Sequence, residues 1–417
     1  RTWHTMTPMR EAAEHAPFEA LSRAQGDGII ATPYPELAAS RARGPIVELP
    51  PESAGPLAAF AGGSPTVMQA VSYDAVQEVL RDGRRFSSSL YGKTMGLVMG
   101  RSILEMDEPE HGRHRGLIQQ AFQKRALERW ERDLVRPAID ARIDAFVARG
   151  RADLVRELTF PFPVEVICGM IGVPEESHDD FHRWAVELIS IQFDIERGFA
   201  ASQKLRDLFA ALLVERRGTP RDDLLSILAH AELDGTRLDD ESIFAFLRLL
   251  APAGAETTYR SSSNLLVGLL THTEQLDALR ADRSLMENAI DEGLRWECPL
   301  TGITRTATGD TVVCGVAVPK DAVIHVSLGA ANHDDAKFPD PERFDIRRAN
   351  AKQHLAFAFG PHRCLGQHLA ILETRVLLEQ LFARLPNLRL DPDAEAPAIT
   401  GAMFRSPAAL PVVFDAA

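Results

Sequence analysis

A cysteine in a glycine-flanked loop constrains this chain more than any other feature. Residues 357–366 read F-x-x-G-x-x-x-C-x-G, with the cysteine at position 364, and the helical-looking run Gln367–Glu373 follows. The loop therefore presents Cys364 at a helix N-terminus, where unpaired N–H groups and the positive end of the helix dipole stabilise an anionic sulfur. A thiolate held in this way is suited to be the axial ligand of an iron. A lone cysteine is more often a small buried apolar residue, so the loop alone leaves both interpretations open.

The composition is that of a globular protein without a basic surface overall. Of the 417 residues, 45% are hydrophobic and 25% are charged, which are ordinary values for a globular chain. The net charge of −13 argues against general nucleic-acid binding and against a polybasic membrane contact. No apolar run of about 18 residues occurs and the start does not resemble a signal peptide, so we expect no membrane anchor. Four cysteines without C-x-x-C spacing favour a reducing, cytoplasmic setting.

Helical patterns dominate, and the strand-like segments are short and scattered. The longest expected helix runs from Glu241 to about Leu270. Ser284-x-x-Glu287 predicts a capping box that opens another helix, with Leu285, Ala289, Ile290 and Leu294 on its apolar face. The other expected elements are a strand over Val67–Val71, a helix over Tyr73–Arg81, an irregular segment over Phe86–Met106, helices over 111–149 and over 151–214 with breaks at Pro161, Pro163 and Pro174, β segments near Ile303–Thr306 and Val323–Val326, and a last helix to about Leu385. No flexible linker divides the chain, so we predict one domain over residues 1–417, mainly α with a minor β sheet.

An acid and an alcohol stand side by side in the middle of the long helix. Residues 250–258 read L-A-P-A-G-A-E-T-T. Pro252 removes one helix hydrogen bond and Gly254 lacks a side chain, so we expect the helix to open locally there. Glu256 and Thr257 together are suited to pass protons to a ligand held in that opening. Taken alone, the motif is more typical of a solvated glutamate with a β-branched neighbour on an ordinary helix.

Together these motifs resemble those of the cytochrome P450 family. The cysteine loop has the pattern of that family's haem-binding loop, and residues 250–258 resemble (A/G)-G-x-(D/E)-T-(T/S) of its distal helix. Glu292-x-x-Arg295 and the segment Phe338–Phe344 resemble its E-x-x-R pair and its meander, and they occur in the family's order. The resemblance implies a cytochrome P450 fold, with a long central helix over a buried haem b, iron protoporphyrin IX. It also implies a structural network of Glu292, Arg295 and Arg343.

The resemblance assigns further residues to the cofactor and to the chemistry. Two haem propionates would be costly to bury without cations, and His111 with Arg115 on one helix face, Arg305 and His362 match the family's propionate-binding positions. A basic solvated helix is the alternative for His111 and Arg115. The expected haem-binding residues are His111, Arg115, Arg305, Phe357, Gly360, His362, Cys364 and Gly366, with Cys364 as the metal ligand, and the expected catalytic residues are Glu256 and Thr257. Ala358 departs from the pattern, because many relatives have glycine there.

The activity that the resemblance implies is a monooxygenase reaction. One oxygen atom from O2 enters a small apolar substrate, and electrons come from NAD(P)H through a separate reductase and ferredoxin, because no flavin or iron–sulfur domain follows Cys364. A local basic patch would steer an acidic ferredoxin despite the net charge, although scattered surface cations are the alternative. We expect a monomer without nucleic-acid partners. The patch comprises Arg113, Arg347, Arg348, Lys352 and Arg363.

Substrate identity stays open, as do two other activities. A terpenoid, steroid, fatty acyl or aromatic compound is favoured over a sugar or nucleotide, because the segments that line the family's pocket are rich in apolar residues. The same haem would also serve a peroxide-driven peroxygenase, against which the Glu256–Thr257 pair argues, or a haem sensor or carrier without turnover. A cysteine hydrolase is disfavoured, because no catalytic-cysteine signature surrounds Cys364. The pocket segments are Phe86–Ile103, Phe181–Phe199, Leu249–Thr257, Leu300–Ile303 and Ala402–Phe404.

Overall fold

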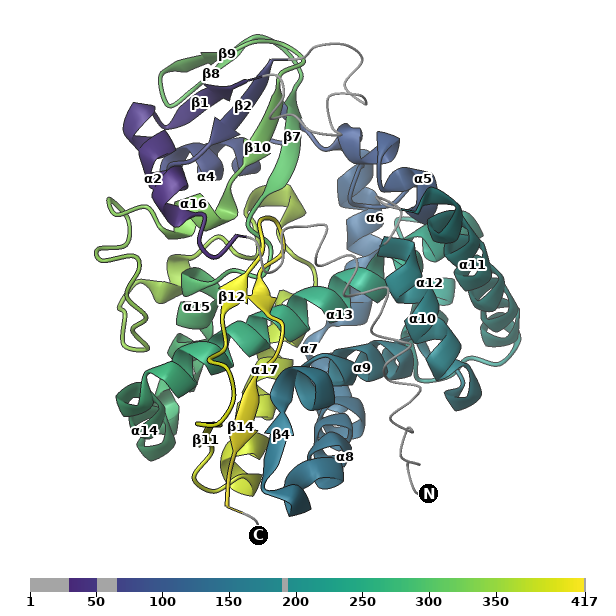
Figure 1. Ribbon diagram of the computed structural model, residues 1–417. Coiled ribbons are helices and arrows are strands. Elements are labelled where there is room, and N and C mark those ends of the chain that lie inside the picture. The colour runs from purple at the N-terminus through teal and green to yellow at the C-terminus, as the bar shows by residue number, and fades with distance from the viewer. Residues whose placement is uncertain (1–29, 51–65, 190–193, 416–417) are drawn as a thin grey trace.

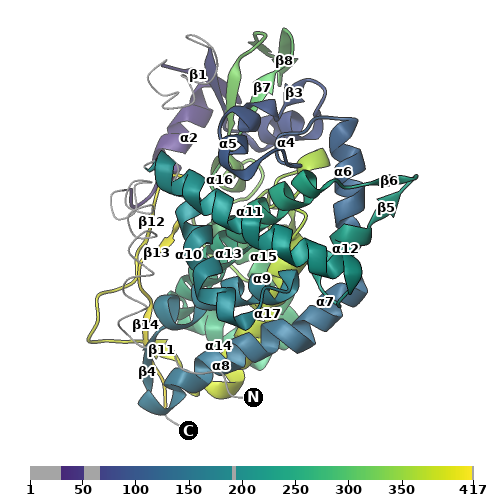
Figure 2. The same ribbon diagram turned by 90° about the vertical axis from the view of Figure 1, so that its right-hand side faces the viewer.

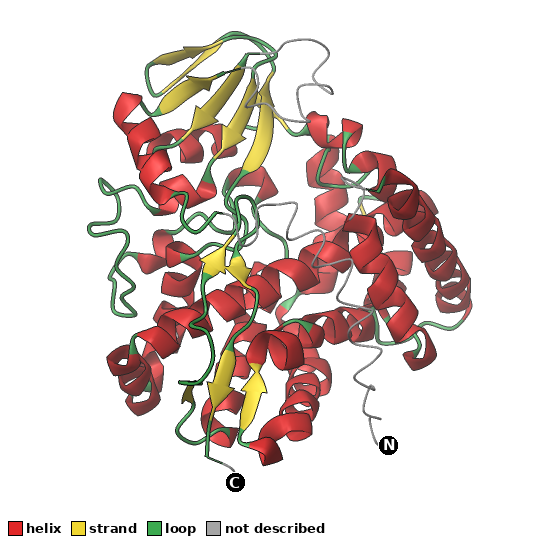
Figure 3. Cartoon of the chain, in the orientation of Figure 1, coloured by secondary structure: helices red, strands yellow, loops and turns green. Residues whose placement is uncertain are grey.

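Helices form most of the molecule and surround one long central helix, α13 (Figures 1 and 3). The computed structural model describes residues 30–50, 66–189 and 194–415. Helix α13 spans 32 residues and is buried along most of its length. The α-helices are α2 (Tyr34–Arg43), α4 (Tyr73–Arg81), α5 (Gly96–Met99), α6 (Glu110–Gln119), α7 (Lys124–Trp130), α8 (Arg136–Phe146), α9 (Pro161–Ile171), α10 (His178–Ile189), α11 (Ile195–Gly218), α12 (Leu224–His230), α13 (Asp240–Thr271), α14 (Thr273–Ala281), α15 (Met286–Trp296), α16 (Leu328–Asn332) and α17 (Gln367–Arg384).

A five-stranded sheet lies at one end of the molecule, beside α2 and α4 (Figure 1). Its order is β1-β2-β10-β7-β3, in which β2 and β10 are parallel and the other pairs are antiparallel. The remaining described strands form a three-stranded sheet, β11-β14-β4, and two-stranded pairs. The strands are β1 (Ile46–Leu49), β2 (Val67–Ala70), β3 (Phe86–Ser87), β4 (Arg151–Asp153), β5 (Glu232–Leu233), β6 (Thr236–Arg237), β7 (Ile303–Ala307), β8 (Thr311–Val313), β9 (Val316–Val318), β10 (Val323–Val326), β11 (Arg389–Leu390), β12 (Ile399–Thr400), β13 (Ser406–Pro407) and β14 (Pro411–Val413). The predicted fold class, mainly α with a minor sheet, is confirmed.

Packing around α13 creates the larger of two hydrophobic cores. Helices α9, α10 and α11 pack against it on one side, as the two ribbon views agree (Figures 1 and 2), and α15 and α17 pack against it as well. The smaller core lies between the five-stranded sheet and α4. Within the described ranges, no helix combines the length and the apolar composition that crossing a membrane requires.

Local sequence signals explain several helix boundaries. Helix α4 has the predicted bounds, because the Ser72 hydroxyl accepts a hydrogen bond from the N–H of Ala75 and caps it. The Asp239 carboxylate caps α13 in the same way, accepting from the N–H of Ser242 at 2.7 Å. The break predicted at Pro161 is confirmed, because a short π-helical turn ends at Thr159 and α9 begins at Pro161, but the break predicted at Pro163 is wrong. Both prolines lie in the first turn of α9, where a missing N–H leaves no helix hydrogen bond unmade.

The predicted capping box at Ser284 is also wrong. The Asp282 carboxylate accepts hydrogen bonds from both the N–H and the hydroxyl of Ser284, so this hydroxyl does not cap α15. A short 3₁₀ turn results, and α15 begins after it. An aspartate that bonds the backbone two residues on is a strong local competitor of a helix cap. The predicted apolar face is otherwise buried, at Ala289, Ile290 and Leu294.

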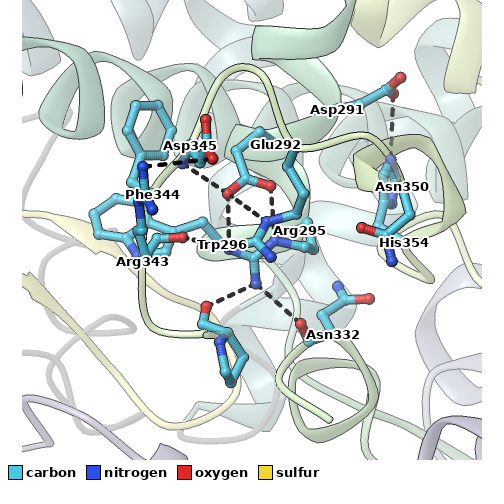
Figure 4. A network of polar contacts seen from close by, with 12 residues as sticks. Asp291, Glu292, Arg295, Trp296, Asn332, Arg343, Phe344, Asp345, Asn350 and His354 are labelled. Atoms are coloured by element: carbon cyan, nitrogen blue, oxygen red, sulfur yellow. Dashed lines mark hydrogen bonds and ion pairs between the residues drawn. The ribbon is translucent and has the colours of Figure 1, made fainter. Parts of the chain in front are cut away.

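A buried ion cluster joins α15 to the segment that follows α16 (Figure 4). Glu292 and Arg295 are both fully buried, and Nε of Arg295 donates to Oε2 of Glu292 at 2.7 Å. Arg348 is the third member, because its Nε donates to Oε1 of Glu292 at 3.1 Å. The same Glu292 oxygen accepts from the N–H of Asp345 at 2.9 Å, which fixes the course of the chain leading to Arg348.

The predicted assignment of Arg343 to this cluster is therefore wrong. Its side chain is 68% exposed and lies 3.7 Å from Asp345, and only its backbone carbonyl faces inward. That carbonyl accepts hydrogen bonds from Arg295 and Arg348. Arg348 is in turn wrong as a member of the basic surface patch, since it is buried.

Exchanging either arginine for alanine separates these two roles. We expect Arg348→Ala to lower the free energy of unfolding by about 3–5 kcal/mol, because it leaves a buried carboxylate partly unpaired. The matched change Arg343→Ala should cost less than about 1 kcal/mol, as for an exposed ion pair. Urea denaturation of both variants measures the difference. Equal losses would contradict the assignment.

Candidate active site

Cys364 lies directly before α17, held by backbone hydrogen bonds. Its N–H donates to the carbonyl of Phe357 at 2.8 Å. Burial raises the pKa of the Cys364 thiol, while the N–H groups of Gly366 and Gln367 and the guanidinium of Arg115 act to lower it. The side chain itself is exposed, although it lies deep in the fold. The sulfur therefore faces space that the described residues leave open, under N–H groups suited to a thiolate.

Two residues of the loop, Gly360 and Ala358, adopt positive φ angles. Gly360 has φ of 72° and packs so closely that an added Cβ would lie 2.3 Å from the carbonyl oxygen of Leu80. Ala358 has φ of 57° without being a glycine, a conformation that costs an L-residue roughly 1–2 kcal/mol. At Gly366, by contrast, a Cβ would meet no atom within 4 Å. The loop is thus pressed onto α4 on one side and open beside the sulfur.

The face of α13 that carries Thr257 is open as well. Ala253 is exposed although it lies in the middle of a largely buried helix. The Thr257 hydroxyl, one turn later, donates to the carbonyl of Ala253 at 2.9 Å. We call Ala253 and Thr257 the open strip of α13.

The sequence predicted that the helix opens locally at this point, and this prediction is wrong. Helix α13 continues unbroken through Pro252 and Gly254. Gly254 instead permits close packing, because an added Cβ would lie 2.6 Å from Cδ1 of Ile167 in α9. The space beside Thr257 therefore arises from the small side chain of Ala253 and not from a local break.

Glu256 is buried, so the solvated-glutamate alternative is wrong. Its side chain is 6% exposed, and Oε1 accepts from Nη2 of Arg260 at 3.1 Å. Burial raises the pKa of the Glu256 carboxyl, although Arg260 lowers it in part. A carboxyl group whose pKa is raised toward neutrality exchanges protons more readily near pH 7.

Basic side chains from three separate segments converge near Cys364. The rings of His111 and His362 lie 3.9 Å apart between centroids. Arg305 on β7 is 4% exposed, and its Nη1 donates to the carbonyl of Thr304 at 2.8 Å. Arg115 on α6 donates to the carbonyl of Arg363 at 2.7 Å, which places it against the cysteine loop. We call His111, Arg115, Arg305 and His362 the basic cradle.

Little negative charge from the described residues faces the buried cradle, where Glu108 acts on His111 and Asp107 acts on Arg305. Burial lowers the pKa of His362 to about 3, and the charges of His111, Arg305 and Arg115 add to this effect. Burial likewise lowers the pKa of Arg305. Among the described residues, only Glu108 forms an ion pair with the cradle, at 3.0 Å from Nδ1 of His111. A flat cofactor with two carboxylates would supply the missing anions, so these residues fit haem.

Some residues that contact the site belong to no sequence motif. The Tyr91 hydroxyl accepts from the N–H of Thr304 at 3.0 Å and hydrogen-bonds Arg305. Ser88 lies 3.3 Å from Nε2 of His362. Both belong to Phe86–Met106, whose length and irregular composition were the only signals that it is functional. Phe357 is half-buried and packs against the larger core.

Comparison with known proteins identifies the fold. The family model described as cytochrome P450 matches residues 190–404. This chain belongs to the cytochrome P450 family. It is a monooxygenase, an oxidoreductase with a haem iron, as its named relatives are.

Relatives of this P450 cover most of its length. The steroid C26-monooxygenase of Mycolicibacterium smegmatis is 36% identical over 356 residues, 83% of this chain and 87% of the relative. Cytochrome P450 monooxygenase PikC of Streptomyces venezuelae is 35% identical over 378 residues, 88% of this chain and 87% of PikC. The crystal structure of CYP109E1 from Bacillus megaterium with testosterone has a TM-score of 0.82 and 28% identity, covering 92% of this chain and 99% of that one.

Neutralising Arg305 should affect the apoprotein and the haem-bound P450 in opposite ways. We expect Arg305→Met to weaken haem binding about 10- to 100-fold, which corresponds to one lost charge-assisted hydrogen bond. The apoprotein should be no less stable, because a buried cation without an anion disappears. Haem transfer to an acceptor protein and urea denaturation of the apoprotein measure the two effects. The exposed Arg113→Met is the control, and equal haem loss in both variants would contradict the cradle.

Proposed function

We propose that Cys364 is the iron ligand of this P450 and that Glu256 and Thr257 deliver protons during oxygen insertion into an apolar substrate. The observation that carries the proposal is the position of the Cys364 sulfur, beneath the N–H groups of Gly366 and Gln367 and beside the basic cradle. His111, Arg115, Arg305 and His362 would bind the two propionates. Phe357 and Gly360 would shape the loop around the sulfur, and Gly366 would leave room for the haem plane.

The proposed chemistry divides between the cofactor and α13. Haem iron with a thiolate ligand supplies the activation of O2 and the cleavage of its O–O bond. The Thr257 hydroxyl would exchange its Ala253 acceptor for the oxygen species to be protonated. Glu256, the next residue along the helix, would restore the proton to Thr257 through water. Its raised pKa favours this relay at neutral pH.

We propose a steroid-sized apolar substrate. The relative from M. smegmatis is named as a steroid C26-monooxygenase, and CYP109E1 was crystallised with testosterone. Three segments expected to line the pocket, Phe86–Ile103, Leu249–Thr257 and Leu300–Ile303, present mainly apolar side chains, and Leu249 and Leu250 are only half-buried. Within Phe181–Phe199, residues 190–193 lie outside the described structure.

Electrons would come from NAD(P)H through a reductase and an acidic ferredoxin. Arg113, Arg347, Lys352 and Arg363 are exposed, which supports a basic docking surface even without Arg348. The single domain, the monomeric state and the cytoplasmic location expected from the sequence stay predictions. The Glu256–Thr257 pair argues against the peroxygenase alternative. NADH consumption in response to a substrate separates the sensor alternative from the monooxygenase.

Removing the Thr257 hydroxyl tests the proton-delivery proposal. With a ferredoxin system and a steroid substrate, we expect Thr257→Ala to keep NADH consumption within a few-fold of wild type. Product should fall by at least about tenfold, and the missing electrons should appear as hydrogen peroxide, because proton delivery is lost. Product and peroxide per NADH are the quantities measured.

Thr271→Ala is the matched control for this experiment. Thr271 lies on the same helix, and its hydroxyl also bonds back to a carbonyl, that of Val267 at 2.7 Å. Equal effects of the two variants would contradict the assignment of Thr257. If wild type consumed no NADH in response to any substrate, the sensor alternative would replace the monooxygenase.

A further inference from the structure

We propose that His182 of α10 passes protons from solvent to Glu256 through a small hollow between α9, α10 and α13. The proposal rests on the proposed role of Glu256 as the proton donor to Thr257. It adds the source of those protons, which the motif around Glu256 does not specify.

Glu256 and His182 line the same hollow. It lies between the N-terminal part of α9, α10 and one face of α13, and its lining is apolar except for Glu256, His182 and Tyr259. About 30 Å³ is open to the centre of a water-sized sphere, which is room for one or two water molecules. Such waters would join the two titratable side chains.

Helical geometry separates this hollow from the site of oxygen chemistry. Pro252, Glu256 and Tyr259 line the hollow at helical spacing and share one face of α13. Ala253 and Thr257 form the open strip on another face. Glu256 thus adjoins Thr257 in sequence but meets water from the α10 side, so protons would enter from behind the helix.

Glu256 needs a proton source other than its ion-pair partner. It is 6% exposed, and the partner recorded for it is Arg260. A guanidinium does not release its proton in proteins, and a phenol such as that of Tyr259 ordinarily keeps its own near neutral pH. Imidazole is the side chain whose unperturbed pKa permits both uptake and release there.

His182 spans the distance from the surface to the hollow. The residue is half-buried, so part of it contacts solvent, while its Nε2 atom is buried. The ring lies 5.6 Å from that of Phe160, measured between centroids, which holds it against the hollow. In the transfer, the protonated imidazole gives one proton to a water of the hollow and that water gives one to the Glu256 carboxylate. His182 then recovers a proton from solvent, so charge and atoms balance.

A second buried carboxyl group provides a competing route and therefore a control. Glu373 of α17 is 2% exposed, and burial raises its pKa to about 8. Its recorded hydrogen-bond partner is Thr258, and it does not line the hollow. If protons entered from the α17 side, Glu373 would be required in place of His182.

The test compares His182→Phe and His182→Gln with Glu256→Gln and Glu373→Gln in the haem-loaded enzyme. Turnover is driven by NADH and ferredoxin, and the solvent deuterium isotope effect on kcat is measured together with product per NADH. We expect both His182 variants to lower kcat about tenfold and to enlarge the isotope effect, as Glu256→Gln does, with KM unchanged. Added imidazole should restore part of the rate of His182→Phe, which a purely structural defect would not allow. Glu373→Gln should behave as wild type.

The outcomes separate this proposal from the one on which it rests. If Glu256→Gln is impaired while both His182 variants match wild type, His182 is not the donor and the proposal fails. If Glu373→Gln reproduces the defect of Glu256→Gln, protons enter from the α17 side and the proposal fails as well. If Glu256→Gln itself matches wild type, the role of Glu256 in the proposed function is lost. Should His182→Phe lose haem, His182→Gln, which stays polar, decides the test.

Discussion

Buried positive charge beside Cys364 is the constraint on which the rest of the site depends. His111 and Arg305 are 2% and 4% exposed, and α6, β7 and the cysteine loop each bring part of this charge to one place. A buried guanidinium such as that of Arg305 costs several kcal/mol to bury without an anion, whereas burial lowers the pKa of His111 and His362 and favours their neutral forms. Two propionates would supply the anions that these buried cations lack, so we expect haem binding and the final packing of these segments to be coupled.

Helix α13 divides the interior into two environments because it stays intact. Its open strip, Ala253 and Thr257, faces the proposed haem side, whereas Glu256 lines the hollow toward α10. Gly254 lets α9 pack closely against this part of α13. In the proposed mechanism, protons would reach Glu256 from the α10 side of the helix, through the hollow.

The sequence alone predicts those features that depend on residues close together in the chain. The cysteine loop, the start of α17 and the Glu256–Thr257 pair follow from residues within a few positions of one another. The buried cluster contains Arg348 and not the predicted Arg343. Which arginine reaches Glu292 depends on how Glu292, more than fifty residues away, holds the N–H of Asp345, and local spacing does not show this. Tyr91 and His182 belong to no motif. The contact of Tyr91 with β7 and the position of His182 at the hollow beside α13 arise only in the folded chain, and no spacing within their own segments reveals them.

The absorption spectrum of the dithionite-reduced protein under carbon monoxide tests the central claim most directly. Wild type and Cys364→Ala are compared, each loaded with haem. We predict a strongly red-shifted Soret band in wild type, as a thiolate ligand gives, and its absence from Cys364→Ala. An unshifted band in wild type, or the same shifted band in both proteins, would contradict the assignment of Cys364 as the iron ligand.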